Sequence, residues 1–227
     1  MSDLIGQRWD EEYQHGRYGG EPPIPFIAEI LKILHATGRS RDAGLYVGCG
    51  NGRNYLPLVD AGANLHGIDI APAAIRSLLA RRPAQKLPVL VGDFRSYRPE
   101  KRFGYLIAIQ VFQHGTEGDA GQYFTNVAAV LRDEGFFFLR VNSCSTEMFH
   151  RHTLIERNEH GGFTIRYEDG PKRGLPVHFY ARDELLAKGA RDFELVSGPR
   201  EDVTKRAPPK TGSWAQWEVV WRRRRRV

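Results

Sequence analysis

The sequence predicts an α/β protein built on a doubly wound, mostly parallel sheet. Three observations carry this prediction. Short apolar runs alternate with helix-length segments through the first two thirds of the 227 residues, a glycine-rich turn follows the first run, and apolar residues between the runs recur at helical spacing. Strands that alternate with helices in this way are joined by right-handed crossovers and lie parallel in one sheet.

Five strands are predicted in this region. Their ranges are Gly44–Val47, Asn64–Ile68, Pro88–Val91, Tyr105–Ile109 and Gly135–Val141. Two helical faces lie between them, formed by Ile75, Leu78 and Leu79 and by Phe124, Val127, Ala128 and Leu131. Pro72 suits the first turn of a helix that ends before Pro83, and Pro57 suits the first turn of a helix that begins near Arg53.

The last third of the chain predicts shorter, antiparallel pieces. Residues Gly161–Tyr180 are expected to form two extended segments around a turn at Asp169–Gly174, before a short helix at Asp183–Ala187. Two late strands, Phe193–Val196 and Trp214–Trp221, are separated by a proline-bearing loop. Because no long helix joins them, they can pair antiparallel.

Composition and charge narrow the class of protein. Apolar residues make up 41% of the chain, and neither a leader nor a membrane-length apolar run is apparent, so we expect a soluble, cytoplasmic protein. The cysteines have no metal or disulfide spacing, and His150 and His152 lack nearby carboxylates, so no metal site is expected. Five of the net +6 charges lie in Arg222–Arg226, which predicts a solvated tail, with an RNA, membrane or acidic-partner contact as the alternative.

The stretch LYVGCGNGRN, residues 45–54, carries glycines at every second position directly after the first strand. A glycine-rich turn between a strand and a helix lets the backbone approach a ligand closely, and the helix N-terminus favours negative charge. A dinucleotide loop would have the spacing G-x-G-x-x-G. Here the spacing is G-x-G-x-G, with Arg53 and Asn54 next, which fits an adenosyl group better than a pyrophosphate.

Four motifs in order resemble those of class I S-adenosylmethionine-dependent methyltransferases of the small-molecule type. They are VGCGNGRN, LHGIDIAPAAI, VGDFRSYRP, and LIAIQVFQH followed by VLRDEGFFFLRV. The resemblance covers residues 9–141 well and the remainder loosely. It implies a seven-stranded Rossmann-like sheet with an antiparallel last strand, and S-adenosyl-L-methionine as the cofactor.

The resemblance also implies how the chain is organised, as a single methyltransferase domain over residues 1–227. We expect an N-terminal helical lid at 1–40, a cofactor-binding core at 41–142, a substrate-side insertion at 143–182, closing strands at 183–221 and a basic tail at 222–227.

The cofactor-binding residues that the resemblance implies are Trp9, Tyr13, Tyr46, Gly48, Cys49, Gly50, Asn51, Gly52, Asn54, Asp69, Ile70, Asp93, Phe94 and Gln110. Asp69 ends the second strand, where its carboxylate can accept both hydroxyls of a ribose. Asp93 would contact the adenine amino group, Phe94 would offer a backbone N–H to the ring, and Gln110 would line the methionine end. Trp9 and Tyr13 belong to an aromatic segment that resembles a lid, and aromatic faces attract a cationic sulfonium.

Two positions depart from the family pattern. Tyr46 stands where the family commonly has an acidic residue, and Gly104 stands where an acidic residue often begins the fourth strand. A tyrosine offers no full negative charge, so the methionine ammonium would depend more on backbone carbonyls such as that of Gly48.

On the acceptor side, His114 is the predicted general base, because it follows the fourth strand and titrates in a useful range. A histidine that caps the next helix is the alternative. Tyr18 is a candidate acceptor contact, as are His178 and Tyr180, which lie two residues apart and are expected to share a strand face toward the substrate.

The predicted reaction is methyl transfer to an oxygen or nitrogen of a small molecule. The tetrapeptide of amino-methylating DNA enzymes and the Pro-Cys nucleophile of cytosine carbon-5 enzymes are both missing, which argues against nucleic acid as the acceptor. Two alternatives stay open at this point: an RNA or protein methyltransferase that uses the basic tail, and a nucleotide-binding oxidoreductase or non-catalytic binding module. The oligomeric state is not predicted.

Overall fold

The computed structural model describes residues 2–16 and 18–225. Their contacts gather in two compact units, residues 1–107 with 130–135 and residues 108–129 with 136–227. The division runs through two strands, β4 (Phe103–Ile109) and β5 (Leu131–Asn142), and so does not follow the boundaries expected from the sequence. The single-domain assignment stays a prediction.

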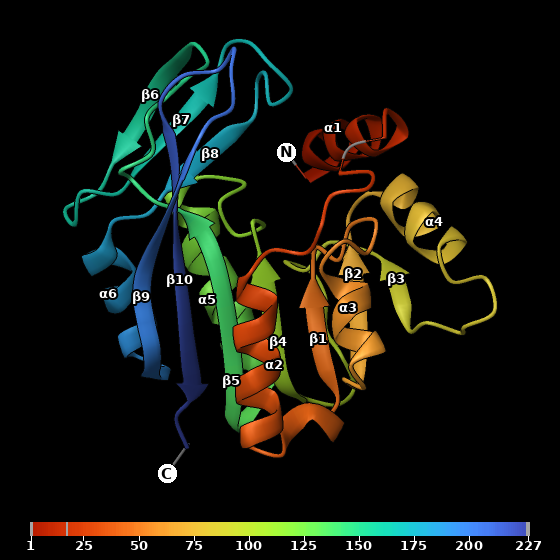
Figure 1. The fold of residues 1–227 in the computed structure, drawn as a ribbon. Coiled ribbons are helices and arrows are strands. Elements are labelled where there is room, and N and C mark those ends of the chain that lie inside the picture. The colour runs from red at the N-terminus through yellow and green to blue at the C-terminus, as the bar shows by residue number, and fades with distance from the viewer. Residues whose placement is uncertain (1, 17, 226–227) are drawn as a thin grey trace. The chain divides into compact units, whose positions relative to one another are not determined.

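A seven-stranded sheet is the framework of the fold, with the order β3-β2-β1-β4-β5-β10-β9 (Figure 1). Its further strands are β1 (Gly44–Val47), β2 (Leu65–Asp69), β3 (Val89–Val91), β9 (Phe193–Lys205) and β10 (Ser213–Arg223). The β1–β2 and β2–β3 pairs are parallel, whereas β10 is antiparallel to both β5 and β9. The predicted doubly wound sheet with an antiparallel end is confirmed.

The first unit places helices around the parallel strands. These helices are α1 (Ser2–Gln14), α2 (Phe26–Ala36), the short 3-10 helix η1 (Arg39–Arg41), α3 (Tyr55–Asp60) and α4 (Pro72–Ala80). Helix α4 begins at Pro72 and ends before Pro83, as predicted, and Pro57 lies in the first turn of α3, where its missing N–H costs no hydrogen bond. All four residues of β1 are buried, as expected for a parallel strand that is covered on both faces.

The second unit has an aromatic core beneath α5 (Glu117–Val130) and α6 (Arg182–Ala190). The Trp221 ring lies 5.5 Å from that of Phe137 and 5.6 Å from that of Phe124. A smaller sheet, β6-β7-β8, completes the unit, with strands at His152–Arg157, Phe163–Tyr167 and Pro176–Phe179. The extended pieces and turn expected for Gly161–Tyr180 are confirmed in β7 and β8, but β6 was not predicted.

The predicted end of this strand at Val196 is wrong, because β9 continues to Lys205, and the proline-bearing loop is confined to residues 206–212. Pro199 lies beside a register shift opposite Glu218 and Val220, so the strand passes the proline at an irregularity and pairs again beyond it.

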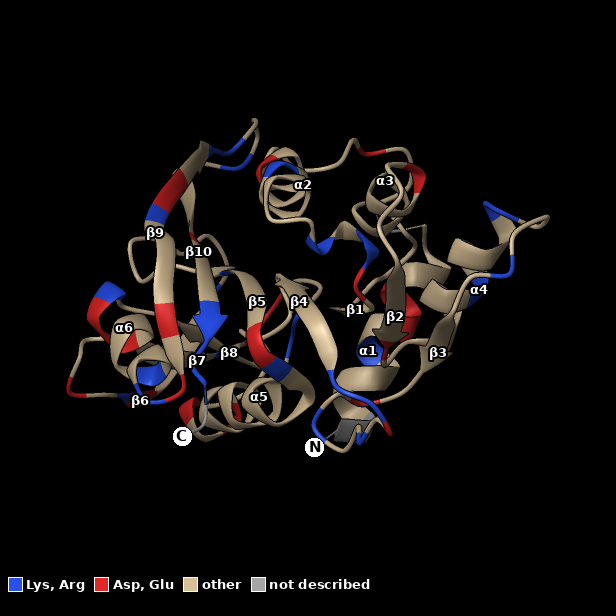
Figure 2. Cartoon of the chain, turned by 90° about the horizontal axis from the view of Figure 1, so that it is seen from below, with Lys and Arg blue, Asp and Glu red and all other residues tan. Residues whose placement is uncertain are grey.

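The prediction of a solvated basic tail is also wrong for Arg222 and Arg223, whereas Arg224 and Arg225 are exposed. Arg222 and Arg223 belong to β10, and the Arg224 backbone N–H donates to the Asp192 carbonyl at 3.0 Å. Arg223 is 2% exposed and pairs with Asp192 at 2.8 Å, and Arg222 pairs with Glu194 at 2.9 Å. Figure 2 shows these basic residues at the blue end of β10; Arg226 lies outside the described residues.

Within the described part of the chain, no helix is long and apolar enough to cross a membrane. The same residues contain no group of three or more histidine, cysteine or acidic side chains that could hold a metal ion.

Candidate functional site

The glycine loop between β1 and α3 adopts a backbone conformation that requires glycine. Gly48, Gly50 and Gly52 have φ values of 69°, 55° and 86°. These left-handed values cost glycine little and other residues more. The Gly48 N–H donates to the Ile68 carbonyl at 2.7 Å, so the loop is bound to the end of β2. The alternate glycines therefore produce a tight, side-chain-free turn.

Asp69 links this loop to the start of α4. Its two carboxylate oxygens accept hydrogen bonds from the backbone N–H groups of Gly50 at 2.8 Å and Ala71 at 2.9 Å. Burial raises the pKa of Asp69 to about 6, although the backbone N–H groups of Ala71, Gly50 and Ile70 oppose the rise. A carboxylate has about four acceptor sites, and the backbone N–H groups occupy up to three of them. The carboxylate can therefore hold the loop and still accept a hydrogen bond from a ligand.

Helix α1 covers the loop with an aromatic side chain. A Cβ atom placed on Gly50 would lie only 2.5 Å from the Tyr13 hydroxyl oxygen, so this hydroxyl lies directly over the loop. Burial raises the pKa of Tyr13 well above its usual range, and the nearby Asp69 raises it further, so the phenol keeps its proton as a hydrogen-bond donor. Asp10 fixes the helix by accepting from the Ala73 N–H of α4 at 2.5 Å.

The other aromatic residues of the opening segment lie around Tyr13. The rings of Trp9 and Tyr18 are each 6.2 Å from the Tyr13 ring. The Arg53 guanidinium lies over Tyr18 at 5.8 Å and pairs with Glu21 at 2.7 Å. The structure thus brings the three predicted aromatic residues together, and it adds Arg53, which the sequence interpretation did not include.

Tyr46 is buried next to the loop and contacts Asn54. Its hydroxyl hydrogen-bonds to the Asn54 side chain, whose oxygen also accepts the Ile24 N–H at 3.1 Å. Burial raises the pKa of Tyr46, so the side chain remains a neutral phenol. The position that departs from the family pattern therefore fixes the end of the loop through Asn54 instead of offering a charge.

The side chains of Cys49, Asn51 and Ile70 make contacts within the first unit. The Cys49 thiol points at β2, since a Cβ on Gly67 would lie 2.9 Å from its sulfur, and burial raises the pKa of the thiol. The Asn51 side chain accepts the Arg53 N–H at 3.2 Å. Ile70 packs against α1, where a Cβ on Gly6 would lie 3.3 Å from it.

Asp93 follows β3, but its carboxylate is already paired. Arg95 contacts both of its oxygens through Nε at 3.1 Å, and Nη2 reaches Oδ2 at 2.7 Å. Burial would raise the pKa of Asp93, but the hydrogen bonds and charge of Arg95 outweigh it and lower the pKa. Phe94 beside it is buried. The sequence interpretation missed Arg95, although an arginine two residues after the aspartate was a visible signal.

In the second unit, Gln110 and His114 lie close together. Gln110 has φ +60°, uncommon for a residue other than glycine and typical of functional sites, and its amide donates to Gln216 Oε1 at 3.0 Å. The Gln110 carbonyl lies close to the His114 ring and favours its protonated form. Burial lowers the pKa of His114 well below its usual range, and the charge of Lys172 lowers it further. His114 is therefore a neutral imidazole, and one of its nitrogens keeps a lone pair.

His178 and Tyr180 lie together, with ring centroids 4.6 Å apart, but neither is exposed. The Tyr180 hydroxyl donates to the Phe112 carbonyl at 2.5 Å, and the His178 ring lies between Thr164 and Glu184 at 2.8 Å from each. Contrary to the expectation of a substrate-facing pair, the polar atoms of both side chains are used inside the second unit.

Comparison with known proteins shows what this chain resembles. Residues 45–135, from β1 into β5, match a family model described as a methyltransferase domain. Two curated relatives are both named ubiquinone biosynthesis O-methyltransferase. The one from Methylobacterium nodulans is 28% identical over 53% of this chain, and the one from Methylobacterium sp. is 31% identical over 40% of this chain. These matches cover 45% and 37% of the relatives, so the chain spans less than half of their length.

A solved structure resembles the fold of nearly the whole chain. The 1,6-didemethyltoxoflavin-N1-methyltransferase of Burkholderia thailandensis, crystallised with 1,6-didemethyltoxoflavin and S-adenosylhomocysteine, superposes with a TM-score of 0.67. The match covers 99% of this chain and 89% of that one at 19% identity. At this identity the two proteins share the fold.

Proposed function

We propose that this protein transfers the methyl group of S-adenosyl-L-methionine to an oxygen or nitrogen atom of a small molecule. The observation that carries the proposal is the junction of the glycine loop with Asp69, where Gly50 offers a side-chain-free surface and a buried carboxylate faces it at 2.8 Å. The methyltransferase domain match over residues 45–135 supports the same assignment.

In this proposal the first unit binds the cofactor. Asp69 accepts the ribose hydroxyls, the Gly48 carbonyl accepts the ammonium, and Tyr13 closes over the loop. Asp93 and the Phe94 N–H bind the adenine, with Arg95 holding the Asp93 carboxylate in place. Tyr46 acts through Asn54 and not as a charged contact.

The second unit supplies the acceptor side, with His114 as the base. When bound, S-adenosyl-L-methionine supplies an electrophilic methyl group. Burial lowers the pKa of His114, so the ring is neutral and holds a lone pair on one of its nitrogens. A buried imidazole with a lowered pKa is a weak base, so it suits an acceptor whose proton is released as the new bond to carbon forms. Positioning of the acceptor supplies the larger share of the rate, roughly 7 to 11 kcal/mol for well-oriented reactants.

The acceptor class is supported by the names of the relatives, an O-methyltransferase of ubiquinone biosynthesis and an N1-methyltransferase of 1,6-didemethyltoxoflavin. Recognition of RNA through the basic tail has less support, because Arg222 and Arg223 are paired with acidic residues of this chain.

The test is titration calorimetry with two ligands. S-adenosylhomocysteine is expected to bind and NADH is not. The reverse result would replace this proposal with the oxidoreductase alternative.

A second prediction concerns His114. His114→Ala is expected to lower turnover at least tenfold, measured as S-adenosylhomocysteine release with a panel of small hydroxylated and amine acceptors, because the proton acceptor is lost. The affinity for S-adenosylhomocysteine should stay unchanged. His152→Ala, which removes an exposed histidine of the same unit, is the control. Equal turnover in the two variants would assign His114 a structural role only.

A further inference from the structure

The segment that carries His114 is bound to β8 through its backbone. His114 forms an isolated bridge with Val177, the Gly115 N–H donates to the Pro176 carbonyl at 3.1 Å, and the His178 N–H donates to the Gln113 carbonyl at 2.8 Å. The position of His114 therefore depends on what holds β8.

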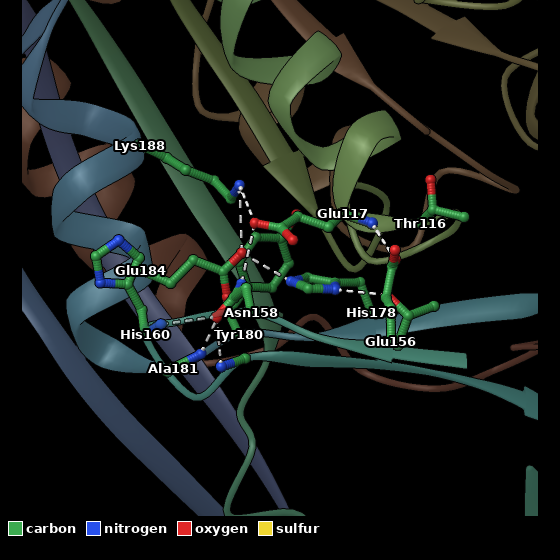
Figure 3. A network of polar contacts seen from close by, with 12 residues as sticks. Thr116, Glu117, Glu156, Asn158, His160, His178, Tyr180, Ala181, Glu184 and Lys188 are labelled. Carbon is green, nitrogen blue, oxygen red and sulfur yellow. Dashed lines mark hydrogen bonds and ion pairs between the residues drawn. The ribbon is translucent and has the colours of Figure 1, made fainter. Parts of the chain in front are cut away.

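The other end of the segment is bound by the side chain of Glu156. The Glu117 N–H, at the start of α5, donates to Glu156 Oε1 at 2.7 Å. The same oxygen accepts the Thr164 hydroxyl at 2.7 Å, and Thr164 Oγ1 lies 2.8 Å from His178 Nδ1. One row of polar contacts thus joins both ends of the segment and passes through the ring of His178 (Figure 3).

The donors and acceptors of this row can be counted. Thr164 has one hydroxyl hydrogen, which it donates to Glu156, so its oxygen must accept a hydrogen from His178 Nδ1. On the other side of the ring, Nε2 lies 2.8 Å from Glu184 Oε1. Burial would raise the pKa of Glu184, but the hydrogen bond with His178, the hydrogen bond with Asn158 and the charge of Lys188 act against burial, and the pKa is lowered. The carboxylate therefore stays ionised and accepts a hydrogen from Nε2.

We propose that His178 is held as a buried, doubly protonated imidazolium between Thr164 and Glu184, and that it acts as a positioning residue for His114. The assignment of His114 as the base rests on the proposed function, but the protonation state of His178 does not. The side chains of His178 and Glu184 are each 1% exposed, and a buried charge persists only when it is paired and hydrogen-bonded, which both partners provide here.

The charged groups around the pair favour this state. Besides Glu184, α6 provides Lys188, whose ammonium lies 3.4 Å from Glu184 and 3.5 Å from Glu117 of α5. Glu156 of β6 faces the ring through Thr164, and the Tyr180 ring lies edge-on to it. Three carboxylates thus surround two cations. A cavity of about 480 Å³ lies beside Glu184; its lining residues are Glu117, Asn158, Glu159, His160, Glu184, Ala187 and Lys188.

The protonation state can be measured directly by NMR on protein with ¹⁵N-labelled histidine. We expect two slowly exchanging ring N–H signals from His178, assigned by their loss in His178→Asn. In Glu184→Gln the new amide can donate to Nε2, so only the Nδ1–H signal should remain. A single ring N–H in the wild type would overturn the proposal.

The positioning role is tested through Thr164, with hydrogen exchange as the readout. Thr164→Val removes the hydroxyl between Glu156 and His178, and we expect the protection of the His114 and Glu117 amides to fall at least tenfold, with recovery in Thr164→Ser. The matched control is Thr153→Val, because Thr153 also donates to a carboxylate, Glu168, but at an exposed site of β6. Wild-type protection in Thr164→Val would overturn the role.

The same variants separate this proposal from the proposed function. Thr164→Val should lower turnover about tenfold while the affinity for S-adenosylhomocysteine is unchanged, since the glycine loop belongs to the other unit. If the protein binds no S-adenosylhomocysteine, the proposed function fails, whereas the NMR and exchange results still decide the state of His178.

Discussion

At the scale of single residues, Asp69 combines two opposed effects. Three backbone N–H groups favour its ionised form, yet burial dominates and raises its pKa to about 6. Below this pH the folded protein holds a proton that the unfolded chain releases, since an aspartate ordinarily has a pKa near 3.9. The stability of the free protein therefore falls as the pH rises from about 4 to about 6, and is constant with respect to this group above that.

This titration predicts a pH dependence of cofactor binding. Ribose hydroxyls donate to the ionised carboxylate, so binding of S-adenosylhomocysteine should lower the pKa of Asp69 and release a proton near pH 6. The affinity should fall by up to about tenfold per pH unit below pH 6. Calorimetry in buffers of different ionisation enthalpy measures both effects. Asp69→Asn should bind about a hundredfold more weakly and lose the pH dependence; retention of that dependence would exclude Asp69 as its source.

At the scale of elements, the glycine loop that follows β1 is held between β2 and α1. The loop is bound to β2 by the Gly48 N–H, and α1 lies over it with the Tyr13 hydroxyl at Gly50. The position of α1, a helix about forty residues earlier in the chain, therefore limits the space next to Gly50. A side chain on the loop would compete with both the helix and a ligand.

Two glycine variants separate the steric effect of a side chain on the loop from the effect of backbone strain. Gly50→Ala introduces a Cβ at a positive φ and 2.5 Å from the Tyr13 hydroxyl, and should abolish measurable binding of S-adenosylhomocysteine. Gly62→Ala carries similar strain at φ +88° with no atom within 4 Å of the added Cβ. We expect both variants to lose about 1 kcal/mol of stability in urea denaturation and only Gly50→Ala to lose binding. Equal binding in the two would place the ligand elsewhere.

At the scale of the whole molecule, the C-terminal arginines help to complete the second unit. Arg223 is buried at the end of β10, pairs with Asp192 at 2.8 Å and lies over the Phe193 ring at 5.9 Å. A deletion of residues 222–226 would thus remove strand residues together with charge. It could not report on nucleic-acid binding alone.

A point substitution tests the structural role of this arginine. Arg223→Met should destabilise the protein by about 3 kcal/mol in urea denaturation, because it leaves Asp192 without its buried partner. Arg225→Met, at an exposed position two residues later and beyond the end of β10, should change the free energy of unfolding by less than about 0.5 kcal/mol. Similar losses in both variants would mean that the Asp192 pair contributes little.

Three features could be predicted from the amino-acid sequence alone: the parallel sheet, the glycine loop and the place of Asp69. Each depends on signals that are close together in the chain. An apolar run predicts a buried strand, alternate glycines predict a turn without side chains, and Asp69 lies at the end of the next run. Helix α4 was predicted for the same reason, since prolines mark its beginning and its end.

Three other features became apparent only in the folded chain: the extension of β9, the burial of Arg223 and the hydrogen bonds of His178. The pairing of β9 with β10 continues past Pro199, and Arg223 finds Asp192 thirty-one residues earlier. His178 lies between Thr164 on a neighbouring strand and Glu184 on a helix. These outcomes depend on contacts between segments that are distant in the chain. Such contacts are stronger here than the local tendencies on which the predictions relied, namely that a proline ends a strand and that a run of arginines is solvated.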